Sequence, residues 1–300
     1  MAVSITPLAD TLGTCCTSDG QISLLELERA PLLEQVRATG AILFRGFGAS
    51  PEEFKTFSDR LSSHFMAYRG GAIPRAQVEG DRTVLAVTGS HLGYAVSLHG
   101  EMYYMKQRPA VIWFYCAVPA EAAGETTIAD GEQFYQRLSS ATRSCFARQL
   151  LAYHRTYPDG LWQRVYQTED LAVVADICGE NEIQFSFDPI ARSLTTRSLR
   201  SALSTSVYTQ RPVFINNILP LLDGIVGDTE SRVSWADGSE ISAALAAELR
   251  AIAAELTIPI AWQAGDVLLL DNTRWLHGRR AYSDARRDIH VRLGGPLLTA

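Results

Sequence analysis

The chain has 300 residues, of which 47% are hydrophobic and 20% charged, and its formal net charge is −6. These values are ordinary for a globular protein with a large core, and the acidic balance without a basic run disfavours nucleic acid or an anionic membrane surface as partner. No apolar run approaches the roughly 20 residues that a membrane helix needs, and we expect no signal peptide. The five cysteines show no C-x-x-C spacing, which predicts reduced thiols in a cytoplasmic protein.

The first third of the chain shows two helical patterns around one apolar run. Apolar spacing predicts a helix over 24–38 that ends at Gly40, followed by a buried strand over 40–46. A second helix is expected from Ser50 to about His64, because serine, proline and a glutamate three residues on form a helix start. Residues 67–96 are irregular and contain several glycines, so we expect an active-site lid there.

From Val96 onward the pattern is mainly β. Continuous apolar runs predict strands. The segment from Asp130 to His154 is expected to be mostly helical, and short strands and loops are expected over 160–236. The expected elements are strands at 110–118, 211–216, 265–271 and 287–293 and an amphipathic helix at 241–256. Short apolar strands framed by a few helices, without a βαβ rhythm, predict a mainly β (α+β) fold with a jelly-roll core, that is, a double-stranded β-helix. No linker or repeat divides residues 1–300, so we expect one domain.

Three distant segments carry metal-ligating residue types. His99 and Glu101 are two residues apart, and on a strand such residues point to the same face. His277 follows a buried strand and would complete a set of two histidines and one carboxylate, which leaves open positions on Fe(II) for oxygen activation. A lone histidine is more often structural, and His91 in the expected lid is the main rival ligand. The strand phase also places Ser97 and Tyr103 on the polar face, and Leu98, Met102 and Tyr104 on the other.

Strand phase selects one arginine as a ligand for an anionic co-substrate. Arg287 shares the apolar face of the last strand, whereas Arg286 and Arg292 fall on the outer face. A buried guanidinium needs an anion, and a carboxylate of 2-oxoglutarate suits it bidentately. An ion pair with a protein carboxylate is the alternative interpretation.

Several segments occur together in an order that resembles one enzyme family, the TauD/TfdA family of Fe(II)/2-oxoglutarate-dependent oxygenases. They are 40–47 (GAILFRGF), 99–104 (HGEMYY), 113–116 (WFYC), 124–130 (GETTIAD), 235–239 (WADGS), 265–267 (GDV) and 271–279 (DNTRWLHGR). The resemblance is closest to the natural-product branch, which is syringomycin-hydroxylase-like and clavaminate-synthase-like. It implies that His99, Glu101 and His277 bind Fe(II), and that Thr126 and Arg287 hold the distal carboxylate of 2-oxoglutarate.

Two positions separate the chain from other branches of the family that it resembles. Glu101 supplies the carboxylate that halogenating relatives lack, which argues against chlorination. Val291 stands where sulfonate-using members carry a second arginine, so a taurine-like grip on the substrate is not expected.

The same resemblance implies a reaction with O2 as co-substrate. We expect hydroxylation of an aliphatic C–H bond in a small molecule, namely an amino acid or an amino-acid-derived intermediate, free or tethered to a carrier protein. Desaturation, epoxidation or cyclisation is the first alternative, and a non-catalytic metal-binding jelly-roll module is a remote one. The candidate substrate contacts are Tyr68, Arg75, His91 and Tyr103.

Overall fold

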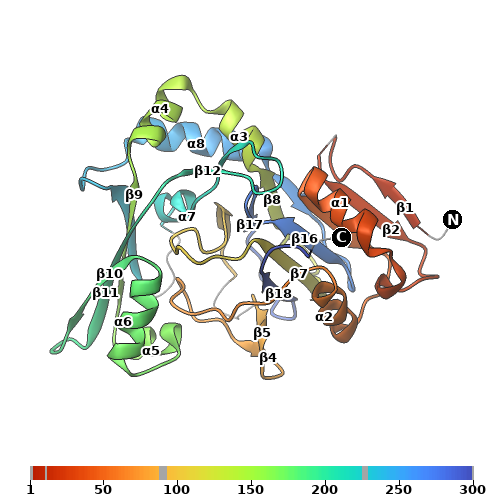
Figure 1. Cartoon of the computed structure of the whole chain (residues 1–300), viewed down its shortest axis with the longest axis horizontal. Helices are drawn as coiled ribbons and strands as arrows, with labels where there is room; N and C mark the ends of the chain where they lie inside the picture. The colour runs from red at the N-terminus through yellow and green to blue at the C-terminus, as the bar shows by residue number, and fades with distance from the viewer. Residues whose placement is uncertain (1–2, 11, 88–92, 225–228, 299–300) are drawn as a thin grey trace.

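The structure, a computed structural model, describes residues 3–10, 12–87, 93–224 and 229–298. Two mainly antiparallel sheets face each other at its centre (Figure 1). The larger sheet has the order β1 (Val3–Thr6), β2 (Thr14–Ser18), β3 (Ala41–Arg45), β16 (Val267–Asp271), β7 (Val111–Val118), β18 (Asp288–Gly294), β5 (Asp81–Ala86) and β4 (Gln77–Val78). Within it, only the β2–β3 pair is parallel. The smaller sheet has the order β15 (Ile258–Ile260), β8 (Thr126–Asp130), β17 (Trp275–Arg279) and β6 (Val96–His99). This mixed architecture confirms the expected α+β fold with a jelly-roll core.

The larger sheet is buried on both faces, which explains the continuous apolar runs in its central strands. Ile112 and Phe114 of β7 join the core between the two sheets, whereas Trp113 and Tyr115 pack on the outer face beneath the N-terminal helices. A strand that is buried on both sides cannot alternate apolar and polar residues. The run over 110–118 was therefore correctly predicted as a central strand. The polar atom of its buried tryptophan has a partner, since Trp113 Nε1 donates to Ser62 Oγ at 2.9 Å.

The N-terminal helices cover that outer face. The expected helix over 24–38 is divided into a 3-10 turn η1 (Leu24–Glu26) and α1 (Arg29–Thr39), and Gly40 ends α1 in the left-handed conformation with φ 73°. Ser50 and Glu53 form the expected capping box of α2 (Pro51–Asp59). That helix ends before His64, since Arg60 caps it and the chain turns back towards the C-terminal segment, where Ser62 bridges to Leu297.

The segment between β8 and β15 carries the remaining helices of the described residues, as well as a third sheet (Figure 1). Its helices are α3 (Gly131–Arg137), α4 (Ser140–Arg148), α5 (Leu161–Tyr166), α6 (Leu171–Glu180), α7 (Ile218–Leu222) and α8 (Ala243–Leu256). The third sheet has the order β10 (Ile183–Asp188), β11 (Ser193–Arg200), β9 (Leu151–Tyr157) and β14 (Glu230–Trp235), and β12 (Leu203–Thr205) pairs with β13 (Pro212–Phe214). The third sheet packs its β9 face into the main core through Leu151 and Tyr153.

Three sequence-based expectations were wrong here. Helix does not extend to His154, because the alternating residues of 151–157 form β9. Residues 160–236 are not only short strands and loops, since α5, α6 and an eight-residue β11 lie there. The stretch over 67–96 is not wholly irregular, because β4 and β5 join the edge of the larger sheet, where β5 pairs with β18.

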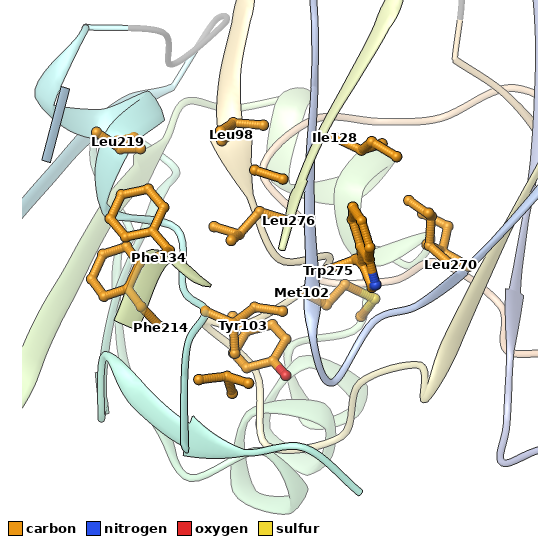
Figure 2. Packing of buried hydrophobic residues seen from close by; sticks show 14 of the residues in the cluster. Leu98, Met102, Tyr103, Ile128, Phe134, Phe214, Leu219, Leu270, Trp275 and Leu276 are labelled. Carbon is orange, nitrogen blue, oxygen red and sulfur yellow. The ribbon is translucent and has the colours of Figure 1, made fainter. Parts of the chain in front are cut away.

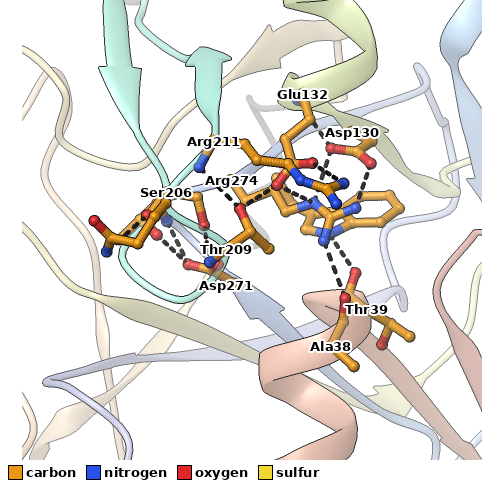
Figure 3. Close-up of polar contacts among 12 residues, drawn as sticks. Ala38, Thr39, Asp130, Glu132, Ser206, Thr209, Arg211, Asp271 and Arg274 are labelled. Carbon is orange, nitrogen blue, oxygen red and sulfur yellow. Dashed lines mark hydrogen bonds and ion pairs between the residues drawn. The ribbon is translucent and has the colours of Figure 1, made fainter.

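The core between the sheets extends under α3 and α7 (Figure 2). Phe134 stacks on Phe214 with ring centroids 4.4 Å apart, and Leu276 and Ile128 come from adjacent strands of the smaller sheet. At the edge of this core, Arg274 forms a buried ion pair with Asp130 at 2.7 Å (Figure 3). The pair ties β17 to β8 and thereby fixes the strand that carries His277.

All five cysteines are free thiols, as expected. No helix in the described part of the chain is long and apolar enough to cross a membrane.

Candidate active site

The first two metal-ligand candidates lie at the end of β6, but not on one strand face. The strand ends at His99, and Glu101 sits in the turn that follows, where Met102 has a positive φ of 60°. The turn reverses the expected alternation: Tyr103 points into the core, and Tyr104 lines the pocket. Same-face strand spacing was therefore the wrong reason for a pairing that the structure nevertheless has.

His99, Glu101 and His277 converge at one end of the jelly roll. One ligand atom from each lies within 4.8 Å of the other two. The imidazole centroids of the two histidines are 4.3 Å apart, and His277 Nε2 lies 3.5 Å from Glu101 Oε2. The backbone of β17 brings His277 directly opposite His99 of β6. Two imidazoles and one carboxylate at this spacing form a set that can bind one transition-metal ion facially.

Protonation of the cluster also suits a metal. Burial, reinforced by the neighbouring His277, lowers the pKa of His99 to about 3, so its imidazole is neutral at physiological pH. Burial alone would raise the pKa of Glu101, but Arg75 and then His277 bring it well below its usual range. His99 Nδ1 lies 2.9 Å from the carbonyl oxygen of Ser97. Because a carbonyl can only accept, Nδ1 is the donor and Nε2 keeps a free lone pair for a metal.

Asn272 fixes the backbone that carries Glu101, a role that the sequence did not reveal. Its Oδ1 accepts from Glu101 N at 2.9 Å, and its Nδ2 donates to the carbonyl oxygens of Glu101 (3.2 Å) and Pro109 (2.8 Å). Asn272 is fully buried. Its place directly after the apolar run of β16 was visible in the sequence, but its partners are up to 171 positions away along the chain.

Arg287 and Thr126 both line the pocket beside this cluster. Arg287 is buried, and Nε donates to the carbonyl oxygen of Gly124 at 2.9 Å, while Nη1 has no hydrogen-bond partner. Burial, followed by the nearby Arg279, lowers the pKa of Arg287 to about 10. The alternative interpretation of Arg287 was an ion pair with a carboxylate of the chain. No such ion pair is seen among the described residues. A buried cation with an open donor fits a carboxylate ligand.

Of the two arginines near Arg287, Arg286 is exposed as expected, whereas Arg292 is buried. Arg286 is exposed and pairs with Asp284 at 3.0 Å, as expected of an outer position. Arg292 does lie on the opposite face of β18, but α2 covers that face. Its side chain is only 2% exposed and pairs with Asp59 at 3.0 Å. The error arose because the sheet was assumed to be open to solvent on its outer side.

The candidate substrate contacts fall into three groups. Tyr68 and Arg75 line the pocket. Tyr103 does not: its ring belongs to the buried core that also includes Phe214 and Leu276 (Figure 2), and its hydroxyl donates to the carbonyl oxygen of Asn272 at 3.0 Å. His91 lies outside the described residues.

Tyr104 and Arg155 also line the pocket, and the sequence placed neither of them correctly. Tyr104 was placed on the opposite strand face because the turn at Met102 was not foreseen. Arg155 was hidden because its segment was read as helix, although Leu151, Tyr153, Arg155 and Tyr157 alternate with period 2.

A jelly roll with two histidines, one carboxylate and an unpaired arginine at its mouth is the arrangement of non-haem iron, 2-oxoacid-dependent oxygenases. The chain matches the family described as taurine catabolism dioxygenase TauD, TfdA family over residues 4–293. It belongs to this family of Fe(II)/2-oxoglutarate-dependent dioxygenases.

Curated relatives are similar in sequence, and solved structures share the fold. A clavaminate synthase-like protein of Arabidopsis thaliana is 26% identical over 266 residues, covering 83% of this chain and 80% of the relative. The dapdiamide synthesis protein DdaC of Enterobacter agglomerans is 26% identical over 307 residues, covering 96% and 91%. Among solved structures, PvcB of Pseudomonas aeruginosa aligns with a TM-score of 0.62 at 18% identity (100% of this chain, 96% of the other). A taurine dioxygenase of Burkholderia xenovorans aligns with a TM-score of 0.61 at 13% identity, covering 100% and 96%.

Proposed function

We propose that this enzyme hydroxylates an aliphatic C–H bond of an amino acid or an amino-acid-derived natural-product intermediate, with decarboxylation of 2-oxoglutarate to succinate. The observation that carries the proposal is the convergence of His99, Glu101 and His277 within 4.8 Å, beside the open donor of Arg287. The natural-product assignment is supported by the dapdiamide synthesis relative. Desaturation, epoxidation or cyclisation remains the alternative outcome of the same chemistry.

In this proposal, His99, Glu101 and His277 hold Fe(II), and Arg287 with Thr126 holds the distal carboxylate of 2-oxoglutarate. When bound, iron and 2-oxoglutarate supply O2 activation and removal of a hydrogen atom from the substrate. The residues of the chain orient these groups and exclude water. Thr126 Oγ1 already accepts from Trp262 Nε1 at 3.0 Å, which leaves its hydroxyl proton free to donate to a carboxylate.

We also propose that residues 67–96 contain the lid over this site. Support comes from Ala72 to Arg75, which line the pocket, and from Tyr68, whose hydroxyl accepts from Ala72 N at 3.1 Å. The hairpin of β4 and β5 narrows the moving part to the residues before Gln77. Tyr68 and Arg75 are the proposed substrate contacts from this segment.

The setting of the enzyme is part of the proposal. Residues 1–300 act as one oxygenase domain, since the core between the two jelly-roll sheets also includes Tyr153 and Phe214 from the segment 131–256. Five free thiols favour a cytoplasmic location. The substrate is free or tethered to a carrier protein.

One experiment tests both the site and the reaction. Full-length protein with Fe(II), 2-oxoglutarate and O2 is offered a panel of free and carrier-loaded amino acids, and O2 uptake, succinate and product mass are measured. Gain of one oxygen atom indicates hydroxylation or epoxidation, and loss of two hydrogen atoms indicates desaturation or cyclisation. His277→Ala should abolish Fe(II) binding and turnover, whereas His154→Ala, a histidine of β9 outside the cluster, should retain both. Full activity and metal content in His277→Ala would refute the proposed site.

A further inference from the structure

We infer that Arg155 binds a carboxylate of the substrate, so that this enzyme acts on an anionic small molecule. The inference rests on the proposed function and names the substrate class for the same pocket. It concerns a residue that neither the sequence motifs nor the metal site requires, contributed by the third sheet and not by the jelly roll.

The strand phase of β9 aims Arg155 at the pocket. Residues 151, 153, 155 and 157 share one face, and all four are buried. Leu151 and Tyr153 on this face pack into the main core. Arg155, the next residue on the same face after Tyr153, lines the pocket. Only 6% of Arg155 is exposed. A charged residue has therefore been placed on the inward face of a strand whose other inward positions are apolar or aromatic.

The neighbours of Arg155 are neutral. Its guanidinium carbon lies 3.7 Å from the ring centroid of Tyr104, and its cross-strand partners are Thr196 and Ser231. Burial raises the pKa of Tyr104 and of Tyr157, so both keep their protons and offer no negative charge. No carboxylate of the described chain forms an ion pair with Arg155, and its Nε has no hydrogen-bond partner.

This unpaired charge is costly unless a ligand compensates for it. A buried ion without a partner loses most of its hydration, and the cation–π contact with Tyr104 compensates for only a small part of that loss. The planar guanidinium matches a carboxylate with two parallel hydrogen bonds. A substrate carboxylate therefore accounts for both the charge and the open donor.

The charges around the pocket lead to the same conclusion. Its described lining contains four arginines (75, 155, 279 and 287) and a single carboxylate, Glu101. Fe(II) and 2-oxoglutarate carry opposite charges of two, so their joint binding leaves this imbalance unchanged. Arg75 pairs with Glu101 at 2.9 Å, Arg287 faces the proposed co-substrate site, and Arg279 donates to the carbonyl oxygens of Val87 and Tyr94. Arg155 is the arginine left for the substrate.

The alternative is a structural role, in which Arg155 only supports the wall formed by Tyr104. The two roles differ in what they discriminate. A structural arginine affects stability and the binding of all ligands alike, whereas a carboxylate-binding arginine separates an acid from its amide. A free amino acid carries such a carboxylate, but an amino acid in thioester linkage to a carrier has lost its α-carboxylate.

The experiment measures binding by calorimetry under nitrogen to full-length enzyme loaded with Fe(II) and 2-oxoglutarate. The probes are free L-amino acids, their C-terminal amides, the pairs aspartate/asparagine and glutamate/glutamine, and aminoacyl pantetheine phosphates. Wild type should bind a free acid at least about tenfold more tightly than its matched amide. Arg155→Met should weaken the acid by about 10- to 150-fold, as expected for a lost charge-assisted pair, and abolish the preference. Arg155→Lys keeps the positive charge but not the two parallel N–H donors of the guanidinium, so it should retain part of the preference for the acid over its amide.

The control variant is Arg232→Met on β14. Arg232 is exposed, and it neighbours Ser231, the cross-strand partner of Arg155, so strand alternation places it on the opposite face of the sheet. Its acid-to-amide preference should equal that of wild type. If Arg155→Met does not fold, as judged by thermal denaturation, Arg155→Lys carries the comparison alone through its reduced preference.

Three results would overturn the inference. The first is an unchanged acid preference in both Arg155 variants, and the second is an effect confined to the phosphate of the pantetheine probes. The third is a loss of 2-oxoglutarate affinity in Arg155→Met, which would assign Arg155 to the co-substrate. Failure of the proposed function looks different, because wild type itself would then not bind Fe(II) or 2-oxoglutarate.

Discussion

Arg75 donates through Nη2 to both carboxylate oxygens of Glu101, at 3.1 Å from Oε1 and 2.9 Å from Oε2. The guanidinium also lies over the ring of Tyr68, 4.4 Å from its centroid. A proposed metal ligand is thus held by a cation from the segment that we propose as the lid. The state of the lid and the orientation of the carboxylate are therefore coupled through a single side chain.

Arg75→Met should destabilise the metal-free protein and increase its response to metal. Removing the cation leaves the carboxylate of Glu101 buried and unpaired, which costs about 3–5 kcal/mol for a buried pair. Fe(II) would compensate for part of that cost in the variant, so the rise in Tm on adding Fe(II) under nitrogen should be larger than in wild type. An equal or smaller rise would contradict the coupling. Arg69→Met in the same segment is the matched control, because no ion pair to Glu101 involves it.

The convergence of His99, Glu101 and His277 could be predicted because the three residues stand in motifs that follow the order of the family. The inward position of Arg287 could be predicted too, since the apolar face of β18 is the one that lines the core. Its role in binding 2-oxoglutarate stays a prediction. Two side-chain orientations were predicted wrongly from the sequence. Packing of α2 buries Arg292 on the face that looked solvent-exposed, and the turn at Met102 exchanges the faces on which Tyr103 and Tyr104 lie.

The segment 151–157 shows a different kind of failure. The sequence shows the alternation of Leu151, Tyr153, Arg155 and Tyr157. The predicted helical region was nevertheless extended to His154, because the residues just before this segment form the helices α3 and α4. A charged residue on the apolar side of an alternating segment was the available signal. It becomes meaningful only when the third sheet is known to pack against the pocket.

Arg287→Ala should weaken 2-oxoglutarate by about 10- to 150-fold, the equivalent of a charge-assisted pair of roughly 1.5–3 kcal/mol. Calorimetric titration of the Fe(II)-loaded protein under nitrogen measures this affinity. Arg286→Ala is the matched control, because that side chain is exposed and pairs with Asp284. Arg292→Ala should leave the affinity for 2-oxoglutarate nearly unchanged but lower Tm, since it strips Asp59 and the end of α2 of their partner. The reverse pattern between Arg287 and Arg292 would refute the assignment.

Asp271→Asn should change how stability depends on pH. Asp271 is buried beside the polar network of Asp130 and Arg274 (Figure 3), and burial raises its pKa from 3.8 to about 6, although Thr273 donates two hydrogen bonds to it. The folded protein therefore favours the protonated acid. The wild type loses this contribution as the pH rises from about 4 through 6, by an amount on the order of 3 kcal/mol for about two pKa units.

Urea denaturation at pH 4.5 and at about pH 7.5 measures this change. The free energy of unfolding of Asp271→Asn minus that of wild type should increase at the higher pH, because only wild type loses stability over this range. Asp81→Asn is the control with the opposite sign: the pKa of Asp81 is lowered to about 2, chiefly by Lys55. The stability that ionised Asp81 contributes is already complete above the pKa of 3.8 that it has when unfolded. The free energy of unfolding of Asp81→Asn minus that of wild type should therefore be nearly constant over the same pH range. A constant difference for Asp271→Asn as well would contradict the prediction.

Limited trypsin digestion should report closure of the proposed lid. Arg69 and Arg75 offer cleavage sites in the segment before β4, and cleavage there requires local opening of chain that is now partly buried. Fe(II) and 2-oxoglutarate, together with a substrate identified from the panel, should slow cleavage at both sites because Ala72 to Arg75 line the pocket that these ligands would occupy. Cleavage after Arg148, exposed at the end of α4, is the internal control and should not change.

Tyr68→Phe provides the matching variant. It removes only the hydroxyl that accepts from Ala72 N at 3.1 Å and lies 3.3 Å from the hydroxyl of Tyr104. Loss of about one hydrogen bond, worth roughly 0.5–1.5 kcal/mol, should increase opening and hence cleavage at Arg69 and Arg75 by about 2- to 12-fold, while the rate at Arg148 stays constant. Equal cleavage rates in wild type and Tyr68→Phe, with no protection by ligands, would leave the segment as an ordinary surface loop.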